Sequence, residues 1–146
     1  MKSIVVGVDG SASADGALEF AVEEAALRGA SLRIVCAWEY RPVVDTDSVY
    51  PSEMFDAFPK EQQDIVSKAL ARATELQPLV ACEGKVLAGQ PASVLLEEAK
   101  HADMIVVGSR GRGGFTSLLL GSVGQQVVHH APCPVVVVRQ NETAAS

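Results

Sequence analysis

Positive charge is scarce in this sequence. Twelve lysine and arginine residues stand against eighteen aspartate and glutamate residues, which gives a formal net charge of −6. Sequence-independent binding to nucleic acid depends on neutralising backbone phosphates with lysine and arginine. We therefore expect no nucleic acid among the partners of this chain.

Cysteine is sparse too. Cys36, Cys82 and Cys133 are too few for a disulfide framework, and no pair of them has the two-residue spacing of a zinc or redox motif. We interpret all three as small buried thiols. A reducing compartment, the cytoplasm, is the expected location.

Long hydrophobic runs are missing as well. The longest apolar run near the N-terminus, residues 4–8, is too short for a signal peptide or a membrane span, so no membrane association is expected. Hydrophobic residues make up 48% and charged residues 21% of the chain, which is typical of a folded globular protein. A length of 146 residues predicts a single domain, residues 1–140, followed by a polar tail, residues 141–146.

Short apolar, β-branched segments alternate with amphipathic segments along the chain. The former predict strands and the latter predict helices. Residues 41–59 contain three prolines and predict a long loop. The expected strands cover residues 3–8, 32–38, 79–86, 103–108 and 135–138, and the expected helices begin near residues 14, 59, 91 and 122.

The helix ends carry recognisable signals. Ser11 or Ser13 is expected to cap the first helix, which Gly29 ends, and Ser122 is expected to cap the last. The apolar face of the last helix is predicted from spacing alone. Its expected buried residues are Val123, Val127, Val128 and Ala131.

The alternation predicts an α/β fold with one five-stranded parallel sheet and helices on both faces. The first and fourth strands are the most apolar and belong at the centre, which favours the order 3-2-1-4-5. In that order the winding reverses between strands 1 and 4, and ligands bind outside the carboxyl ends of the strands at such a reversal. The loops at this point are residues 9–11 and 108–121, so we expect a binding site there.

The second of these loops is rich in glycine. Glycines let backbone N–H groups approach an anion closely, and the following helix N-terminus also favours phosphate. Arg110 and Arg112 add positive charge. The loop has no Gly-Lys-Ser/Thr sequence, so it is not a P-loop of the Walker A type.

The spacing of the loop glycines resembles a known family motif. Gly108, two residues, Gly111, nine residues, then Gly121 and Ser122 match G-2x-G-9x-G-[S/T] of the ATP-binding branch of the universal stress protein family. Residues 4–11, 119–123 and 131–138 are similar as well. The resemblance runs from about residue 3 to 139 and implies a Rossmann-like, adenine nucleotide α-hydrolase-like fold.

The resemblance also implies a nucleotide site. Asp9 would lie near the ribose or near a phosphate-bound Mg²⁺ or Mn²⁺, and the backbone of Ala37 would meet the adenine edge. The glycine loop would wrap the ribose and the phosphates. The implied binding residues are Gly7, Asp9, Gly10, Ser11, Ala37, Gly108, Ser109, Arg110, Gly111, Arg112, Gly113, Gly121, Ser122 and Val123. Asp9 also suits a plain turn or helix cap, which does not exclude ligand contact.

Three functions follow from this sequence. The first is an ATP-binding regulator or sensor in a stress response, with an unknown regulatory protein partner. The second is a slow, metal-dependent ATPase or phosphotransferase, although no residue stands out as catalytic because no nucleophile has an obvious base. The third, a nucleotide-independent interaction module, is disfavoured by the complete glycine motif. The resemblance also implies a homodimer through residues 135–138, which are expected to form an apolar edge strand.

Overall fold

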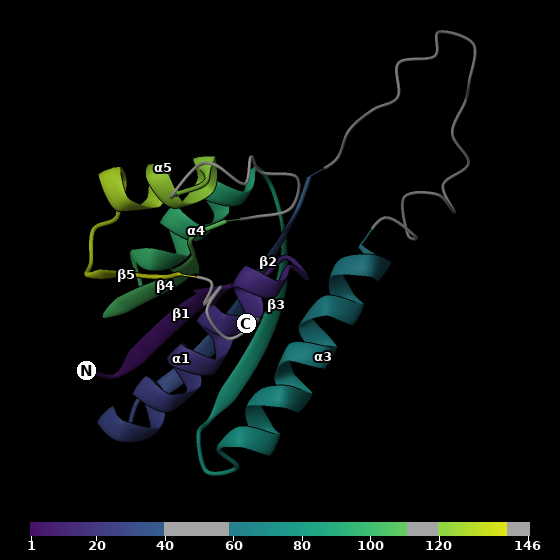
Figure 1. Ribbon diagram of the computed structural model, residues 1–146, viewed down its shortest axis with the longest axis vertical. Helices are drawn as coiled ribbons and strands as arrows, with labels where there is room; N and C mark the ends of the chain where they lie inside the picture. The colour runs from purple at the N-terminus through teal and green to yellow at the C-terminus, as the bar shows by residue number, and fades with distance from the viewer. Residues whose placement is uncertain (40–58, 111–119, 140–146) are drawn as a thin grey trace, which may run out of the picture.

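The computed structural model describes residues 1–39, 59–110 and 120–139. The polar tail at 141–146 lies outside these ranges, and so does the predicted loop at 41–59 except for its last residue. Five parallel strands form one sheet in the order β3-β2-β1-β4-β5, which confirms the predicted topology (Figure 1). The strands are β1 (Ser3–Gly7), β2 (Ser31–Trp38), β3 (Cys82–Ala88), β4 (Met104–Gly108) and β5 (Val135–Val138), and the described helices are α1 (Ala12–Arg28), α3 (Lys60–Leu76), α4 (Pro91–Ala99) and α5 (Ser122–His130).

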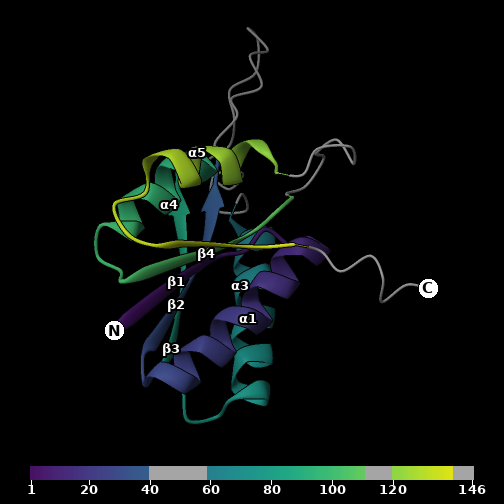
Figure 2. The same cartoon turned by 60° about the vertical axis from the view of Figure 1, so that its left-hand side comes forward.

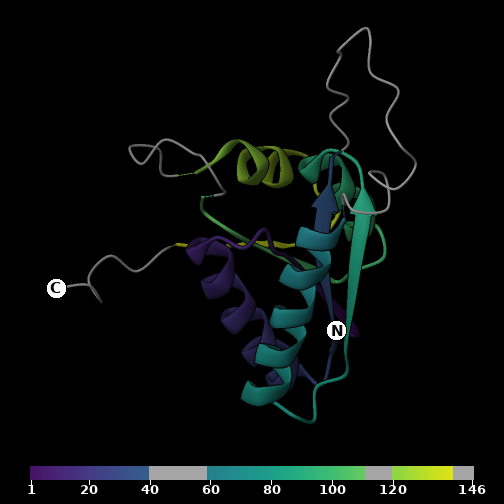
Figure 3. The ribbon, with the colours of Figure 1, turned by 90° about the vertical axis from the view of Figure 1, so that its right-hand side faces the viewer.

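The helices cover both faces of the sheet. Helices α4 and α5 lie on one side, and α1 and α3 lie on the other (Figure 2). Figure 3 shows α1 and α3 next to each other along their face. None of the helices in the described ranges is long and apolar enough to cross a membrane.

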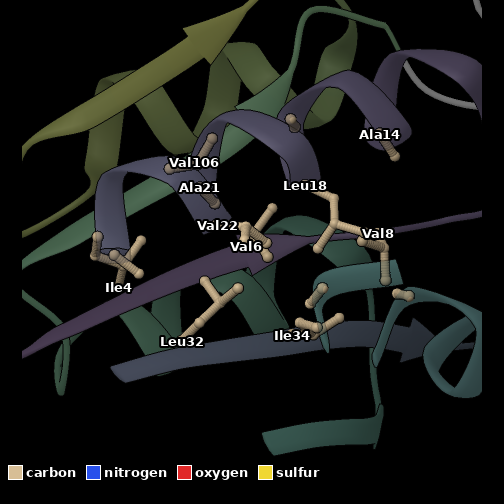
Figure 4. Packing of buried hydrophobic residues seen from close by; sticks show 14 of the residues in the cluster. Ile4, Val6, Val8, Ala14, Leu18, Ala21, Val22, Leu32, Ile34 and Val106 are labelled. Carbon is tan, nitrogen blue, oxygen red and sulfur yellow. The ribbon is translucent and has the colours of Figure 1, made fainter. Parts of the chain in front are cut away.

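Alternating side chains of β1 build two separate cores. Ile4 and Val6 belong to the cluster under α1 and α3, whereas Val5 belongs to the cluster under α4 and α5. Figure 4 shows Ala21 and Val22 of α1 close to Val6. Ile4, Val5 and Val6 are fully buried, because helices cover both faces of this central parallel strand. Ala21 and Val22 are fully buried as well.

Helix α1 begins and ends at side chains that the sequence offers for those roles. Ser11 is the N-cap and its Oγ accepts a hydrogen bond from the N–H of Ala14 at 3.2 Å. Gly29 adopts a left-handed conformation with φ 63°, which glycine tolerates without strain. The helix starts at Ala12, two residues earlier than predicted. Ser13, the alternative cap, is instead buried inside the first turn.

Other sequence predictions are wrong in detail. Of the three cysteines that were expected to be buried, only Cys36 is, while Cys82 and Cys133 are half-buried. Strand β3 begins at Cys82 rather than residue 79, because the chain turns at Leu79, which is fully exposed. Gly121 is the N-cap of α5, so Ser122 is its first helical residue rather than its cap. Val128 is 46% exposed, because α5 presents Val127 to the sheet and the next side chain points about 100° away.

Candidate functional site

A cleft of about 520 Å³ lies at the carboxyl ends of β1, β2 and β4. This is the position of the winding reversal, since β1 and β4 are neighbours while their following helices cover opposite faces. Residues of α3, α4 and α5 complete its walls. The structure therefore places a cleft where parallel-sheet topology predicts one.

Most of the described candidate residues line this cleft. They are Gly7, Asp9, Ala37, Gly108, Ser109, Arg110, Gly121, Ser122 and Val123. Gly10 borders a different hollow, between α1 and α3, and the side chain of Ser11 caps α1. Gly111, Arg112 and Gly113 lie outside the described residues. The structure thus brings together residues from the first, second and fourth strand ends.

The end of β4 presses against the first turn of α1. A Cβ on Gly108 would lie 2.5 Å from Oγ of Ser13 and 2.8 Å from its carbonyl carbon and oxygen, so only glycine fits. The Oγ of Ser13 also accepts a hydrogen bond from the N–H of Arg110 at 3.2 Å. These contacts fix the start of the glycine loop relative to α1.

The N-terminus of α5 faces the same cleft. Gly121 caps it with an extended backbone, and its N–H donates a hydrogen bond to the carbonyl of Ser109 at 2.6 Å. Helical geometry leaves the first-turn amides without acceptors inside the helix, and the helix dipole places partial positive charge there. Together with Arg110, this end of the cleft favours an anion such as phosphate.

Asp9 holds the turn that follows β1. Its Oδ1 accepts a hydrogen bond from the N–H of Ser11 at 2.9 Å, and Gly10 between them has φ 84°, a conformation that favours glycine. Asp9 therefore stabilises a turn, as one of its two expected roles requires, and it also lines the cleft. Within residues 1–39, 59–110 and 120–139, no three His, Cys, Asp or Glu residues group so as to hold a metal ion.

The backbone of Ala37 points toward the cleft. The carbonyl of Val35 accepts a hydrogen bond from Val8 at 2.9 Å, whereas that of Trp38 accepts one from Gly89 of the β3 side at 2.8 Å. Backbone groups alternate along a strand, so those of Ala37 point the same way as those of Val35, beyond the end of β1. The N–H and carbonyl of Ala37 therefore face the cleft, because β1 ends at Gly7 and no longer lies beside β2 at this point.

Several wall residues escaped the sequence analysis. Glu39 follows β2, Gln62 and Ile65 come from α3, and Pro91 and Leu95 come from α4. A signal for them existed. In a parallel α/β sheet every crossover helix begins at the carboxyl edge, so the first turns of α3 and α4 had to approach the cleft.

The second hollow, about 580 Å³, is acidic on balance. Asp15, Glu19, Glu61 and Asp64 border it together with Lys68 and Arg72, and Arg72 donates a hydrogen bond to Glu19 at 3.1 Å. Burial and the neighbouring Glu19 and Asp9 carboxylates raise the pKa of Asp15. This charge opposes phosphate binding, so the cleft at the strand ends is the candidate site.

The chain is therefore an open, parallel α/β domain whose cleft lies where sheets of this kind bind ligands. The chain belongs to the universal stress protein family, whose family model matches residues 1–139. It is 38% identical over 138 residues to a universal stress protein of Mycobacterium tuberculosis, covering 94% of this chain and 45% of that protein. The chain thus spans about half the length of the curated relatives it matches.

Solved structures of the same family share the fold. Universal stress protein UspA from Lactobacillus plantarum is 27% identical, with a TM-score of 0.78 and coverage of 94% of this chain and 97% of that one. A universal stress protein solved in complex with cAMP is 29% identical, with a TM-score of 0.74 and coverage of 96% and 98%.

The contact between Gly108 and Ser13 yields a stability prediction. Gly108→Ala should lower the free energy of unfolding by about 1–3 kcal/mol, because the added methyl group overpacks the junction. Adding Ser13→Ala should not restore stability, since the carbonyl of residue 13 still lies 2.8 Å away. Denaturant unfolding measures both.

Gly16→Ala is the matched control. A Cβ there meets only Val138 at 3.8 Å, and alanine stabilises a helix interior by about 1 kcal/mol relative to glycine. Wild-type stability in Gly108→Ala, or its rescue by Ser13→Ala, would contradict the assigned contact.

Proposed function

We propose that this chain binds an adenine nucleotide, ATP in the first instance, in the cleft and acts as a nucleotide-dependent regulator or sensor in a stress response. The observation that carries the proposal is the cleft itself, with amide donors and Arg110 at the winding reversal. Membership of the universal stress protein family supports it, as does the 29% identical relative solved with cAMP.

The positions of the charged groups in the cleft favour one orientation of the bound nucleotide. Phosphates belong at the N-terminus of α5, beside Gly121, Ser122 and Arg110, where donors and positive charge gather. The base belongs at the end of β2, where the backbone of Ala37 is available and the carboxylate of Glu39 would repel phosphate. The family motif assigns Gly111 to the phosphate loop, and Arg112 and Gly113, which lie in the stretch that varies between family members, are included in the proposal as its neighbours.

Asp9 is the proposed contact for the ribose or for a metal carried by the phosphates. Mg²⁺ is commonly held by one or two carboxylates together with substrate phosphates and waters. The carboxylate of Asp9 at the wall of the cleft fits that chemistry for Mg²⁺ or Mn²⁺. When bound, the metal would neutralise phosphate charge, and Asp9 would orient it.

The slow ATPase or phosphotransferase remains the enzymatic alternative. Efficient phosphoryl transfer needs a positive group on the leaving oxygen and a residue that aligns the nucleophile. A steady-state assay separates the two functions, because turnover that disappears when the cleft is blocked would assign an enzyme. A nucleotide-independent interaction module would bind no nucleotide at all.

Charge at Gly121 tests the phosphate site. Asp and Asn are both favourable N-cap residues of nearly equal size, so Gly121→Asp and Gly121→Asn should both leave α5 and the melting temperature intact. A carboxylate beside the phosphates should weaken ATP binding at least about tenfold more than the amide does. Calorimetric titration measures the difference. Equal affinities of the two variants would contradict the assignment.

We also propose that the chain is a homodimer through β5 and that a regulatory protein reads its nucleotide state. Val135–Val138 is an edge strand of four valines, all half-buried, and such an edge invites a second strand. A two-fold pair of antiparallel edges is a self-complementary contact. With three cysteines and no disulfide spacing, the cytoplasm is the proposed compartment.

The backbone directions in β5 sharpen the dimer test. The carbonyls of Pro134 and Val138 accept hydrogen bonds from Ile105 and Ser109 of the β4 side, so alternation turns the N–H of Val137 outward. Val137→Pro should therefore give a folded monomer, and Val136→Pro should also damage the sheet. Light scattering and circular dichroism distinguish these outcomes. A monomeric wild type at concentrations on the order of tens of micromolar would defeat the proposal.

A further inference from the structure

Gln62 carries a buried acceptor without a partner. It lies in the first turn of α3 and lines the cleft, yet its Oε1 is shielded from solvent and accepts no hydrogen bond from the described part of the chain. Among the described side chains that are not exposed, it is the one buried nitrogen or oxygen in this condition. An unsatisfied buried acceptor is costly, so this oxygen calls for a donor that residues 1–39, 59–110 and 120–139 do not supply.

The position of Gln62 in the cleft indicates that the base of a bound nucleotide, rather than its phosphates, would supply that donor. Gln62 comes from the wall beyond β2, with Ile65 one turn along α3, and not from the phosphate end formed by α5 and Arg110. The backbone of Ala37 opens into the same part of the cleft. A nucleotide with its phosphates at α5 therefore directs its base toward Gln62.

The side chain can reach the ligand by a small motion. Gln62 is half-buried, and its terminal amide turns about a broad torsion with no steep barrier between staggered wells. Rotation toward the cleft exposes Oε1 to a bound base. It breaks no hydrogen bond of that oxygen, because the oxygen has none to lose among the described residues.

We propose that Oε1 of Gln62 accepts a hydrogen bond from the exocyclic amino group of the base and selects 6-aminopurine over 6-oxopurine nucleotides. This inference rests on the proposed nucleotide function. A 6-amino group is a donor and satisfies the oxygen, whereas a 6-oxo group would place one acceptor against another. Discrimination by a site built for one hydrogen bond exceeds discrimination by shape alone.

The chain offers a matched pair of glutamines for the test. Gln63 is the next residue on the same helix, is exposed, and does not line the cleft. Gln62→Met and Gln63→Met remove the same acceptor from the two positions while keeping side-chain length and helix propensity. Calorimetry with ATP, inosine triphosphate and purine riboside triphosphate, which lacks the 6-amino group, compares the full-length variants.

The wild-type chain should bind ATP more tightly than the purine riboside triphosphate by roughly 2- to 13-fold, the value of one net hydrogen bond. That ratio should fall in Gln62→Met and stay unchanged in Gln63→Met. Inosine triphosphate should bind weakest to the wild type and lose part of that disadvantage in Gln62→Met. The melting temperature of ligand-free Gln62→Met should not fall, because the variant removes an unsatisfied group rather than a contact.

Other outcomes overturn the proposal in distinguishable ways. If the wild type binds ATP but does not distinguish the three nucleotides, or if Gln62→Met leaves their ratios intact, Gln62 does not read the base. If the variant instead loses its preference for ATP over 2′-deoxy-ATP, the partner is a ribose hydroxyl. If the wild type binds none of them, the nucleotide function itself fails.

Discussion

The parallel pairing of β1 with β4 is the constraint on which the site depends. Ile4, Val5 and Val6 pair with Met104, Ile105 and Val106, and all six are buried. After β1 the chain continues into α1 on one face of the sheet, and after β4 it continues into α5 on the opposite face (Figure 2). Right-handed crossovers force this divergence, so the space between the two strand ends cannot be closed by either connection. The cleft is a consequence of the topology.

The same topology makes the cleft electrically asymmetric. One end collects the first-turn amides of α5 and Arg110, while the other has Glu39, Gln62 and the apolar Ile65. A negatively charged ligand with an aromatic base therefore has one favourable direction. The close contact of Gly108 with Ser13 holds the phosphate end rigidly, and preorganised donors bind an anion without a further cost of ordering.

The sequence predicts the fold and the position of the cleft, because buried strands, strand–helix alternation and handedness leave few topologies. It also predicts the residues that line the cleft from strand ends, such as Asp9, Ala37 and Gly108. Topology predicts that the first turn of α3 approaches the cleft, but not which of its side chains line it, because the helical stripe that contains Ile65 has the spacing of an ordinary core face. Where that stripe stops packing on the sheet depends on how α3 lies against α1, which is a tertiary property. The predicted N-cap of α5, Ser122, is one residue too late, because Gly121 and Ser122 are both suitable N-cap residues and the sequence does not choose between them.

The central claim is that the cleft between β1 and β4 holds an adenine nucleotide. The most direct measurement is mass spectrometry of the small molecules released on denaturing the purified full-length chain, followed by calorimetric titration of the stripped protein with ATP. The account predicts a released adenine nucleotide, or saturable binding of one molecule of ATP per chain. A protein that releases no nucleotide and gives no binding heat with ATP, AMP or cAMP would contradict it.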